Sequence, residues 1–568
     1  MKRKLLSITM IAALCLTMLP TAGWAADGTG GTIDDWQVPD APTTTGSWTD
    51  DGSYEIDWYT NNPSATEFEL EDAADLAGLA AIVNGTATNN GTTIKDNFSG
   101  DTITLKSGST IDLKDKQWTP IGNASDSYFA GTFDGNNVTI SNLTINKQTS
   151  EKYVGLFGYV REGTIKNVKV DDAYISTSLE QNGGAGGIVG VLLGQQINDD
   201  TTNYSGSIES CSFDGKILVV YAKGFSADSY AGGIVGVSGS SGSNTKYYSK
   251  ISDCTNSGTL SSGLATQLGG IAGCNGNLNG NNTIDDCTNE GAIYPTSDYT
   301  SAIVGGIVAE NYGEIKNSKN SGGISGQAQH TGGIAGIVHE KSVIDACKND
   351  AAITIENGSD IGGIVGLVEE ADGVAIKNCE NTGAISSTNA TPTVSGALSN
   401  EAFTGGIVGA IKGDANDEVT IERCDNSGAL TVSSPVRNTP RIGGIVASHV
   451  DRGVSLKLSE CYNAGTLKIT ASADPSQASA ENDGMGGLVG VVSCDAKMTV
   501  ENCYNTGSLN DDTQYNIITG GLIGLVRTLN TSENEKIFHS AAAIMSARSL
   551  EPRKLVLLSE KTTAIRPA

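Results

Sequence analysis

Short apolar runs, each opened by a glycine doublet, recur along most of the chain. The run GGIVG at residues 362–366 is typical. Its β-branched residues stand side by side and do not alternate with polar ones, which favours strands that are buried on both faces. Glycine doublets favour corners that a side chain would block. Related runs begin at Gly186, Gly232, Gly269, Gly305, Gly332, Gly362, Gly405, Gly443, Gly486 and Gly520.

A second segment with fixed offsets follows every run except the last. In the copy that spans residues 361–385, it carries Cys379 and Asn381 two positions apart. A unit of this length cannot bury its own apolar face, so copies of it must stack on one another. The pattern therefore predicts an all-β solenoid of parallel strands with about ten or eleven rungs, in which length variation falls in loops.

Stacking places equivalent residues of successive rungs above one another. The asparagines are expected to form a ladder whose side-chain amides pair from rung to rung. The cysteines are expected to behave as small buried apolar residues in a reduced ladder, with some disulfides as an alternative and a metal site as a weaker one. The ladder positions are Cys211, Cys254, Cys287, Cys347, Cys379, Cys424, Cys461 and Cys503, with Asn256, Asn289, Asn320, Asn349, Asn381, Asn426, Asn463 and Asn505.

The two ends of the chain follow different patterns. Residues 1–25 have the charged start, apolar centre and small-residue exit of a secretory signal. Residues 26–60, rich in Gly, Thr, Asp and Pro, suit a flexible linker. We expect residues 61–146 to form a cap and the first coils, and residues 147–528 to form the repeats. No glycine follows Gly524, so the tail at 529–568 is expected to be disordered or aberrant.

A helix is predicted inside the cap, over residues 71–84. Leu76, Leu79, Ala80 and Val83 fall on one helical face, while acidic residues occupy the first turn. Such a short helix is marginal by itself. We therefore expect its apolar stripe to cover the open end of the stack, as a terminal unit of a repeat protein must.

Charge and hydropathy exclude two classes of partner. The formal charge is −28, from 36 basic and 64 acidic residues, so nucleic acid and anionic membrane surfaces are poor partners. After the signal, no stretch is apolar for long enough to span a bilayer. These features favour an exported, soluble protein, which we expect to be monomeric.

The stretch WTPIGNASDSYFAGTFDGNNVTISNLTI at 118–145, followed by YVGLFGYV at 153–160, resembles a known family. It looks like the opening of exported bacterial surface proteins with GLUG-type repeats, and the resemblance covers about 67–526. It implies a right-handed parallel β-helix with adhesin-like function. Some relatives cleave IgA as metallopeptidases. The resemblance and the style of the signal imply a Gram-positive, cell-surface setting.

Motifs for catalysis are scarce. His339-Glu340 begins like a zinc peptidase helix, but the second histidine of H-E-x-x-H is missing. The acidic loop Asn198-Asp199-Asp200 leaves calcium as an alternative to our expectation of no cofactor and no metal. Parallel β-helices also include polysaccharide lyases and glycosidases, so a carbohydrate-active enzyme is the second hypothesis. The densest mixed group consists of Arg437, Arg441, His449, Asp451 and Arg452.

Two groups of residues are candidates for binding an extracellular glycan or a surface protein. Counting seven positions on from four successive glycine doublets aligns Tyr312, His339, Glu369 and Lys412 along one exposed edge, where the histidine would respond to pH near neutrality. The simplest interpretation of these four residues is a polar, solvent-exposed ridge. Tyrosines also gather in early loops, where they either pack their own loops or anchor a ligand: Tyr221, Tyr230, Tyr247, Tyr248, Tyr294 and Tyr299.

Overall fold

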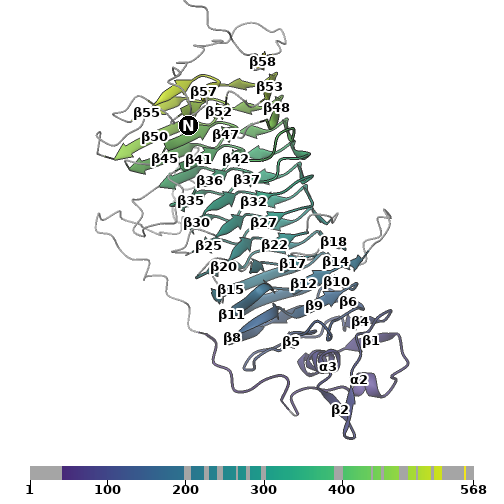
Figure 1. Cartoon of the computed structure of the whole chain (residues 1–568). Coiled ribbons are helices and arrows are strands. Elements are labelled where there is room, and N and C mark those ends of the chain that lie inside the picture. The colour runs from purple at the N-terminus through teal and green to yellow at the C-terminus, as the bar shows by residue number, and fades with distance from the viewer. Residues whose placement is uncertain are drawn as a thin grey trace, which may run out of the picture. The chain divides into compact units, whose positions relative to one another are not determined.

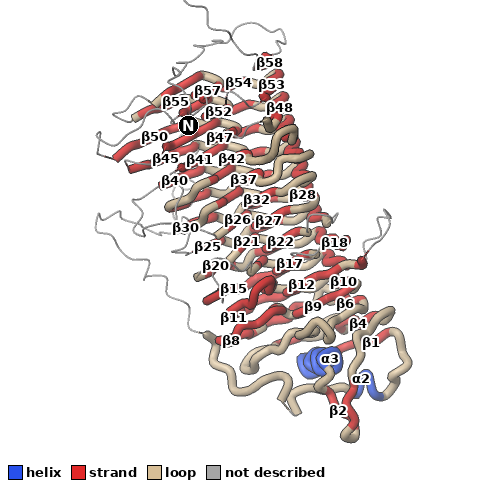
Figure 2. Tube along the Cα trace, viewed as in Figure 1, coloured by secondary structure: helices blue, strands red, loops and turns tan. Residues whose placement is uncertain are grey.

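The structure is a computed structural model of the chain. It describes residues 41–50, 52–196, 206–222, 229–239, 247–263, 266–276, 282–295, 302–388, 401–435, 439–449, 453–472, 484–493, 497–512, 517–527 and 555–557. Strands are the main regular element of the described residues, and nearly all of them pair with the equivalent strand of the next coil, which confirms the parallel β-helix (Figures 1 and 2).

The glycine-led runs continue into an 11-stranded parallel sheet, which agrees with the predicted number of rungs. Successive strands pair in register, as in Val308 with Ala335 and Ala335 with Val365. Its strands are β9 (Phe157–Arg161), β12 (Val189–Leu193), β17 (Val235–Ser238), β22 (Ala272–Asn275), β27 (Val308–Asn311), β32 (Ala335–Val338), β37 (Val365–Val368), β42 (Val408–Ile411), β47 (Val446–His449), β52 (Val489–Ser493) and β57 (Ile523–Arg527).

The next strand of each coil belongs to a 15-stranded sheet. It is parallel except at two pairs, β13 with β18 and β53 with β58. Its strands are β1 (Glu67–Leu70), β4 (Thr102–Leu105), β6 (Thr132–Asp134), β10 (Thr164–Lys166), β13 (Gln195–Gln196), β14 (Gly206–Glu209), β18 (Tyr247–Ser252), β23 (Thr283–Asp285), β28 (Glu314–Lys316), β33 (Val343–Asp345), β38 (Val374–Lys377), β43 (Glu418–Glu422), β48 (Ser455–Ser459), β53 (Lys497–Glu501) and β58 (Leu555–Leu557).

Three further columns of parallel strands complete each coil. The long strands β8 (Thr144–Val154), β11 (Lys169–Gly186) and β15 (Ser212–Ala222) join these columns in the early coils. The asparagine column contains β5 (Ile111–Asp112), β7 (Thr139–Ser141), β19 (Thr255–Asn256), β24 (Thr288–Asn289), β29 (Lys319–Asn320), β34 (Lys348–Asn349), β39 (Glu380–Asn381), β44 (Asp425–Asn426), β49 (Tyr462–Asn463) and β54 (Tyr504–Asn505).

The middle column contains β20 (Thr259–Ser262), β25 (Ile293–Pro295), β30 (Ile324–Gln327), β35 (Ile353–Glu356), β40 (Ile385–Thr388), β45 (Leu430–Pro435), β50 (Leu467–Ser472) and β55 (Leu509–Asp511). The last column ends on the first glycine of each doublet. It contains β16 (Tyr230–Gly232), β21 (Gln267–Gly269), β26 (Ile303–Gly305), β31 (His330–Gly332), β36 (Asp360–Gly362), β41 (Glu401–Gly405), β46 (Thr439–Gly443), β51 (Gly484–Gly486) and β56 (Ile518–Gly520).

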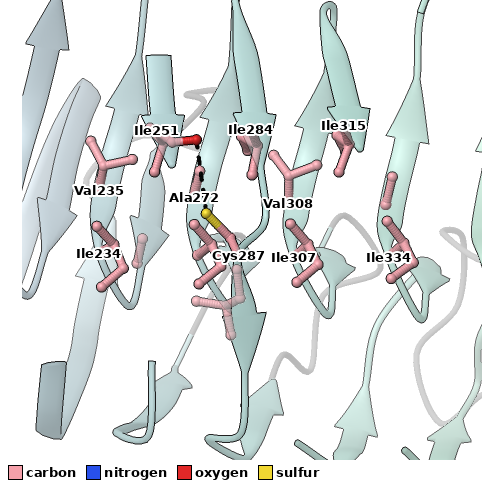
Figure 3. Close-up of a cluster of buried hydrophobic side chains, with 14 of the residues drawn as sticks. Ile234, Val235, Ile251, Ala272, Ile284, Cys287, Ile307, Val308, Ile315 and Ile334 are labelled. Atoms are coloured by element: carbon pink, nitrogen blue, oxygen red, sulfur yellow. Dashed lines mark hydrogen bonds between the residues drawn. The ribbon is translucent and has the colours of Figure 1, made fainter. Parts of the chain in front are cut away.

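The interior is filled by rows of identical or similar apolar side chains. Ile251, Ile284 and Ile315 succeed one another on paired strands, and all three are fully buried (Figure 3). The Cys287 thiol lies in the same interior and contacts the Ile251 carbonyl at 3.8 Å. Branched side chains have few rotamers to lose and pack tightly in such rows.

The asparagine ladder runs through the interior. Seven hydrogen bonds connect eight asparagines from Asn256 to Asn505, with each Nδ2 donating to Oδ1 of the next coil at 2.7 to 2.9 Å. Most of these amides also donate to the carbonyl two residues further on, as Asn381 does to Gly383. Each buried amide is thereby satisfied, which removes the cost of burying it.

The cysteines follow the ladder two positions earlier. None of the eight ladder cysteines forms a disulfide, and seven of them are buried. Each ladder thiol donates to the carbonyl two residues before it, at 3.0 to 3.4 Å. Burial raises the pKa of the Cys254 and Cys379 thiols, so they stay protonated and unreactive.

The glycine doublets are required by close packing between coils. A Cβ atom added to Gly363 would lie 2.1 Å from the Gly406 carbonyl oxygen and 2.4 Å from Cγ of Asn381. The second glycine of the doublet therefore lets the asparagine ladder and the next coil approach the backbone. This is a steric requirement and not one for an unusual backbone angle.

The N-terminal cap differs from the sequence-based expectation in two respects. Helix α3 (Ala73–Asn84) is capped by Asp72, but it is buried from Leu76 to Val83 and not along one stripe. The helix is buried because the preceding residues 41–60 pack near it. These residues were expected to belong to a flexible linker. There, Trp48 Nε1 donates to the Leu113 carbonyl, and the Glu55 amide donates to Ala74.

Aromatic side chains secure this segment against the first coils. Helix α2 (Asp57–Thr60) carries Trp58 and Tyr59, whose rings lie 5.5 and 5.6 Å from the ring of Phe68. Trp58 also stacks on Phe98 at 6.1 Å. A two-stranded antiparallel ribbon, β2 (Ala87–Asn89) with β3 (Thr92–Ile94), completes the cap.

The described part of the tail also differs from expectation. After Arg527, the structure describes only β58, which pairs in antiparallel fashion with β53. The tail is therefore not wholly disordered. Strand β58 pairs with β53 because the exposed edge of a sheet offers unpaired backbone groups to any nearby strand. The remainder of 529–568 lies outside the described residues.

Candidate functional site

A row of side chains follows the outside of the fold where the last column meets the 11-stranded sheet. Each member stands two positions before a glycine doublet, and neighbours in the row pair in register, as His330 does with Asp360. The residue that follows each member points into the main core instead, as Ile361 does. We refer to this row as the outer corner: Tyr230, Gln267, Ile303, His330, Asp360, Phe403 and Arg441.

Two apolar clusters at the outer corner are separate from the main core. One joins Ile303 and Phe403 to Ile337, Leu367 and Ala410, which come from the 11-stranded sheet. The other contains tyrosines of the early coils. Both clusters lie outside the ring of strands, so the fold carries packed apolar surface beyond what its core needs.

The second cluster is built from tyrosine side chains on successive coils. Tyr159 contacts the rings of Tyr153 at 4.9 Å and Tyr128 at 6.1 Å, and the cluster continues through Tyr230 to Tyr312. We refer to these five residues as the tyrosine cluster. Strands β8, β9 and β16 hold three of them in fixed positions, so their rings are ordered before any ligand arrives.

Charged groups surround the tyrosine cluster. Lys152 lies over the Tyr153 ring at 5.7 Å, and Arg161 lies over the Tyr128 ring at 5.6 Å. The Tyr230 hydroxyl donates to Oε2 of Glu310 at 3.3 Å. Burial raises the pKa of Tyr153, with a further contribution from the charge of Glu180. The Tyr153 phenol therefore remains protonated and can donate a hydrogen bond.

Further along the outer corner, the side chains are charged. His330 Nδ1 lies 2.7 Å from Oδ2 of Asp360, whose side chain is 2% exposed, and the Lys412 ammonium lies 3.9 Å from the same oxygen. On the next coils, the Arg441 guanidinium lies 4.5 Å from the Phe403 ring centroid. The Lys412 ammonium thus brings a positive charge close to the buried Asp360 side chain.

The four residues predicted to align along one edge occupy equivalent positions. The backbone amides of Tyr312, His339, Glu369 and Lys412 each donate to the preceding coil, at 2.8 to 3.0 Å. The rings of Tyr312 and His339 stack with centroids 3.8 Å apart and planes 4° apart. The Lys412 side chain, in contrast, reaches Asp360 at the outer corner. We refer to these four residues as the edge row.

His339 differs from the expectation of an exposed, pH-responsive histidine. Its side chain is 8% exposed, and burial lowers its pKa to about 4. The stacked Tyr312 ring removes water from one face of the imidazole, which disfavours the charged form. His339 is therefore neutral at physiological pH and does not titrate near pH 7.

The other predicted residues are distributed differently. Tyr299 lies outside the described residues, as do the side chains of Tyr221 and Tyr247. Tyr248 is buried at 3% exposure, and Tyr294 is half-buried on β25. Of the loop tyrosines, only Tyr230 joins the tyrosine cluster among the described residues.

Sequence reasoning missed three members of the tyrosine cluster, Tyr128, Tyr153 and Tyr159. The signal was present in YVGLFGYV at 153–160, where the two tyrosines flank the first doublet-like run. The mixed charged group is divided by the structure, since Arg441 lies at the outer corner and His449 is buried against the interior. Arg437, Asp451 and Arg452 lie outside the described residues.

Comparison with known proteins gives limited similarity. No family profile matches the chain. A stretch of 154 residues is 32% identical to halomucin from Haloquadratum walsbyi and covers 26% of this chain but 2% of halomucin. The crystal structure of a proposed immunoglobulin A1 protease from Bacteroides ovatus aligns with 74% of this chain and 84% of that one, at 18% identity and a TM-score of 0.28. Within the described residues, no helix is long and apolar enough to cross a bilayer.

Proposed function

We propose that this chain is an exported, cell-surface protein that binds an extracellular glycan or surface protein without catalysing a reaction. The observation that carries this proposal is the tyrosine cluster, a set of packed aromatic side chains outside the core. Rigid aromatic rings with a polar hydroxyl provide contact area at little entropic cost, which suits recognition of sugars and proteins.

Other features support the extracellular setting. The N-terminal pattern of a secretory signal, the resemblance to proteins with GLUG-type repeats and the stretch similar to halomucin are in agreement with it. The parallel β-helix supplies a scaffold on which successive coils present side chains at a spacing of about 4.8 Å. A ligand made of repeated sugar units could contact several coils at once.

A carbohydrate-active enzyme on the same fold is the second candidate. Its support is the charged part of the outer corner, where His330, Asp360 and Lys412 lie together. The Asp360 side chain is almost fully buried and is already in contact with His330 and the Lys412 ammonium. It is therefore poorly placed to act on a polysaccharide, and we place binding first.

The two candidates are separated by one pair of assays on the chain from Ala26 onward. A glycan array measures binding, and incubation with a panel of polysaccharides measures turnover. Binding without turnover is expected. Release of shorter saccharides, lost on substitution of His330 or Asp360, would favour the enzyme instead.

The role of the tyrosine cluster is tested by Tyr128→Ala and Tyr153→Ala, with Tyr294→Ala as a matched control. Tyr294 is also half-buried but lies outside the cluster. Loss of a central aromatic anchor typically costs about 2 kcal/mol or more of binding free energy, or roughly 30-fold in affinity. Equal affinity of all three variants, with unchanged thermal unfolding, would exclude the cluster as the binding surface.

A further inference from the structure

The row of ladder cysteines ends, in the last described coil, at a thiol that is only partly covered. Cys503 is half-buried, whereas Cys461 in the coil before it is fully buried. The two side chains are hydrogen-bonded to each other, and the Cys461 backbone amide also donates to Sγ of Cys503 at 3.3 Å. We propose that Cys461 and Cys503 are a site of oxidative cross-linking, at which a disulfide joins the last two coils.

The register of the coils places the two cysteines opposite each other. Tyr462 pairs with Tyr504 immediately after them, and the strands before them pair with the same offset of 42 residues. Neighbouring strands of a sheet lie about 4.8 Å apart, and a disulfide joins residues whose Cα atoms are about 4.4–6.8 Å apart. Cys461 and Cys503 therefore meet the Cα requirement of a disulfide without any change of register.

Other ladder cysteines have the same spacing, but packing favours closure only in the last coil. The Cβ atoms of a disulfide are about 3.5–4.5 Å apart, so two stacked coils must approach by roughly 1 Å. An inner coil is packed on both sides, since a Cβ atom on Gly487 would lie 2.0 Å from the Gly521 carbonyl oxygen of the next coil. A Cβ atom on Gly521 itself would have nothing within 4 Å. The last coil can therefore move toward its neighbour without losing contact with another coil among the described residues.

Access from solvent also selects the last pair. The other seven ladder cysteines are buried, so an oxidant in solution meets Cys503 first. The hydrogen bond to Cys461, and then burial, raise the pKa of the Cys503 thiol. The reactive thiolate form of Cys503 is therefore scarce at neutral pH. We expect oxidation to be slow at pH 7 and to become faster as the pH rises.

The reaction needs an oxidant, for which a low-molecular-weight disulfide is sufficient. The Cys503 thiolate attacks one sulfur of this disulfide, breaks its S–S bond and releases one thiol. The Cys461 sulfur then attacks Cys503 in the mixed disulfide and releases the second thiol. Each cysteine loses one proton, each released thiol gains one, and two electrons pass from the cysteines to the oxidant. A disulfide formed in this way persists in an oxidising compartment, such as the extracellular setting proposed for this chain.

Incubation of the folded chain from Ala26 onward with glutathione disulfide tests the proposal. Every protein in the test carries Cys494→Ser, because Cys494 lies outside the described residues. The intact mass should fall by two hydrogen atoms without an added glutathione, and peptide mapping without reductant should identify Cys461 linked to Cys503. The reaction should be about tenfold faster at pH 8 than at pH 7, because the thiolate fraction rises tenfold per pH unit below the thiol pKa.

Serine variants separate the two steps of the reaction. Serine occupies the ladder position naturally at Ser318, so the fold accepts it there. Cys461→Ser should stop at a stable glutathione adduct on Cys503, whereas Cys503→Ser should keep its mass. Cys274→Ser is the matched control, because Cys274 is a buried thiol outside the ladder, and this variant should form the cross-link as the parent does.

Three results would overturn the proposal: an unchanged mass after prolonged oxidation at about pH 9, a stable glutathione adduct on the parent, or a disulfide that maps to another pair. Thermal unfolding provides a second readout. The oxidised parent should unfold at a higher temperature than the reduced parent, because the disulfide restricts the unfolded chain, and a reductant should reverse this shift. A lower unfolding temperature after oxidation would also contradict the proposal, because it would show that the folded coils do not accommodate the bond.

Discussion

The interior rows and the outer rows of this β-helix use the same stacking in opposite ways. Inside, each coil repeats the same chemistry, so that Asn349, Asn381 and Asn426 each donate to the next coil. At the outer corner, equivalent positions hold His330, Asp360 and other unrelated side chains. Stacking therefore determines where each side chain lies in every row. It determines the residue type only in rows where a side chain must pair with copies of itself.

The largest effect is expected from breaking an interior row at its middle. Asn381→Ala removes the acceptor of one Asn349 N–H and the donor to the Asn426 Oδ1 atom, and leaves these two buried groups without that partner, while the Asn349 amide keeps its bond to the Ala351 carbonyl. Each such orphan costs about 1–3 kcal/mol, so the variant should lose roughly 4 kcal/mol of stability. Chemical denaturation measures this loss.

Asn505→Ala serves as the control for that variant. Asn505 is half-buried and has only one ladder neighbour among the described residues, so its loss should be about 1 kcal/mol. If both substitutions lower the free energy of unfolding by the same amount, the hydrogen bonds between ladder asparagines add no stability beyond the local hydrogen bonds of each asparagine.

A glycine variant tests the packing between coils and should have the next largest effect. In Gly363→Ala, the new Cβ would lie 2.1 Å from the Gly406 carbonyl oxygen, and neither coil can move without disturbing the stack. Overpacking of this kind typically costs up to about 3 kcal/mol. Gly323→Ala is the matched control, because the nearest atom to its Cβ is 3.9 Å away. A similar fall in unfolding temperature for both would contradict the steric account.

The histidines extend the comparison to pH. Burial lowers the pKa of His449 to about 4, below its unfolded value of about 6.5. Between these values the unfolded chain binds the proton and the folded chain does not, so stability falls as pH falls. The contribution at pH 5 should be about 2 kcal/mol.

His449→Gln should therefore reduce the loss of stability between pH 7 and pH 5, as measured by denaturation at both values. His339→Gln is the companion variant from the edge row. Its pKa is also lowered to about 4 by burial, so its effect should be of the same size. The same pH dependence in the parent and in His449→Gln would contradict the burial argument.

The smallest effect is expected at an outer turn. The residue before each ladder cysteine, and before Ser318 in the coil where serine replaces it, has positive φ, and asparagine occupies this position at Asn317, Asn378 and Asn502. Ala346 adopts φ 53° at the same position without a side chain suited to it. Ala346→Gly should therefore stabilise the fold by roughly 0.5–1 kcal/mol, which raises the denaturation midpoint. A lower midpoint would show that the alanine methyl group contributes packing that outweighs its strain.

The sequence was sufficient to predict the architecture of the coil, because the same pattern of glycine, apolar and ladder positions occurs in many repeats. It predicted the parallel stack and the positions that share a row, since counting residues gives alignment along the stack. Counting residues along the chain does not predict how deeply a side chain is buried. His339 was expected on a solvated ridge, yet the Tyr312 ring covers it, because the direction of a side chain depends on its neighbours in three dimensions.

Composition misled us at the N-terminus for a similar reason. Residues 41–60 contain the Gly, Thr, Asp and Pro of a linker, but Trp48 and Trp58 anchor them to the first coils. The packing of these two tryptophans stabilises the segment despite its otherwise linker-like composition, because each tryptophan buries more apolar surface than several small residues together. The tyrosine cluster was missed in part because three of its members, Tyr128, Tyr153 and Tyr159, lie in the first units, where no cysteine marks the repeat.

The ladder amides also have a shared direction. Every Nδ2–H from Asn256 to Asn463 points toward the next coil, and every carbonyl that receives it points back. Amide dipoles that are aligned head to tail polarise one another and add along the row. The ladder is thus an axial dipole inside an apolar interior, with its positive end at Asn505. The longest helix among the described residues, α3, has 12 residues and lies in the cap, so in the coils the ladder supplies the electrical polarity that other folds obtain from a long helix.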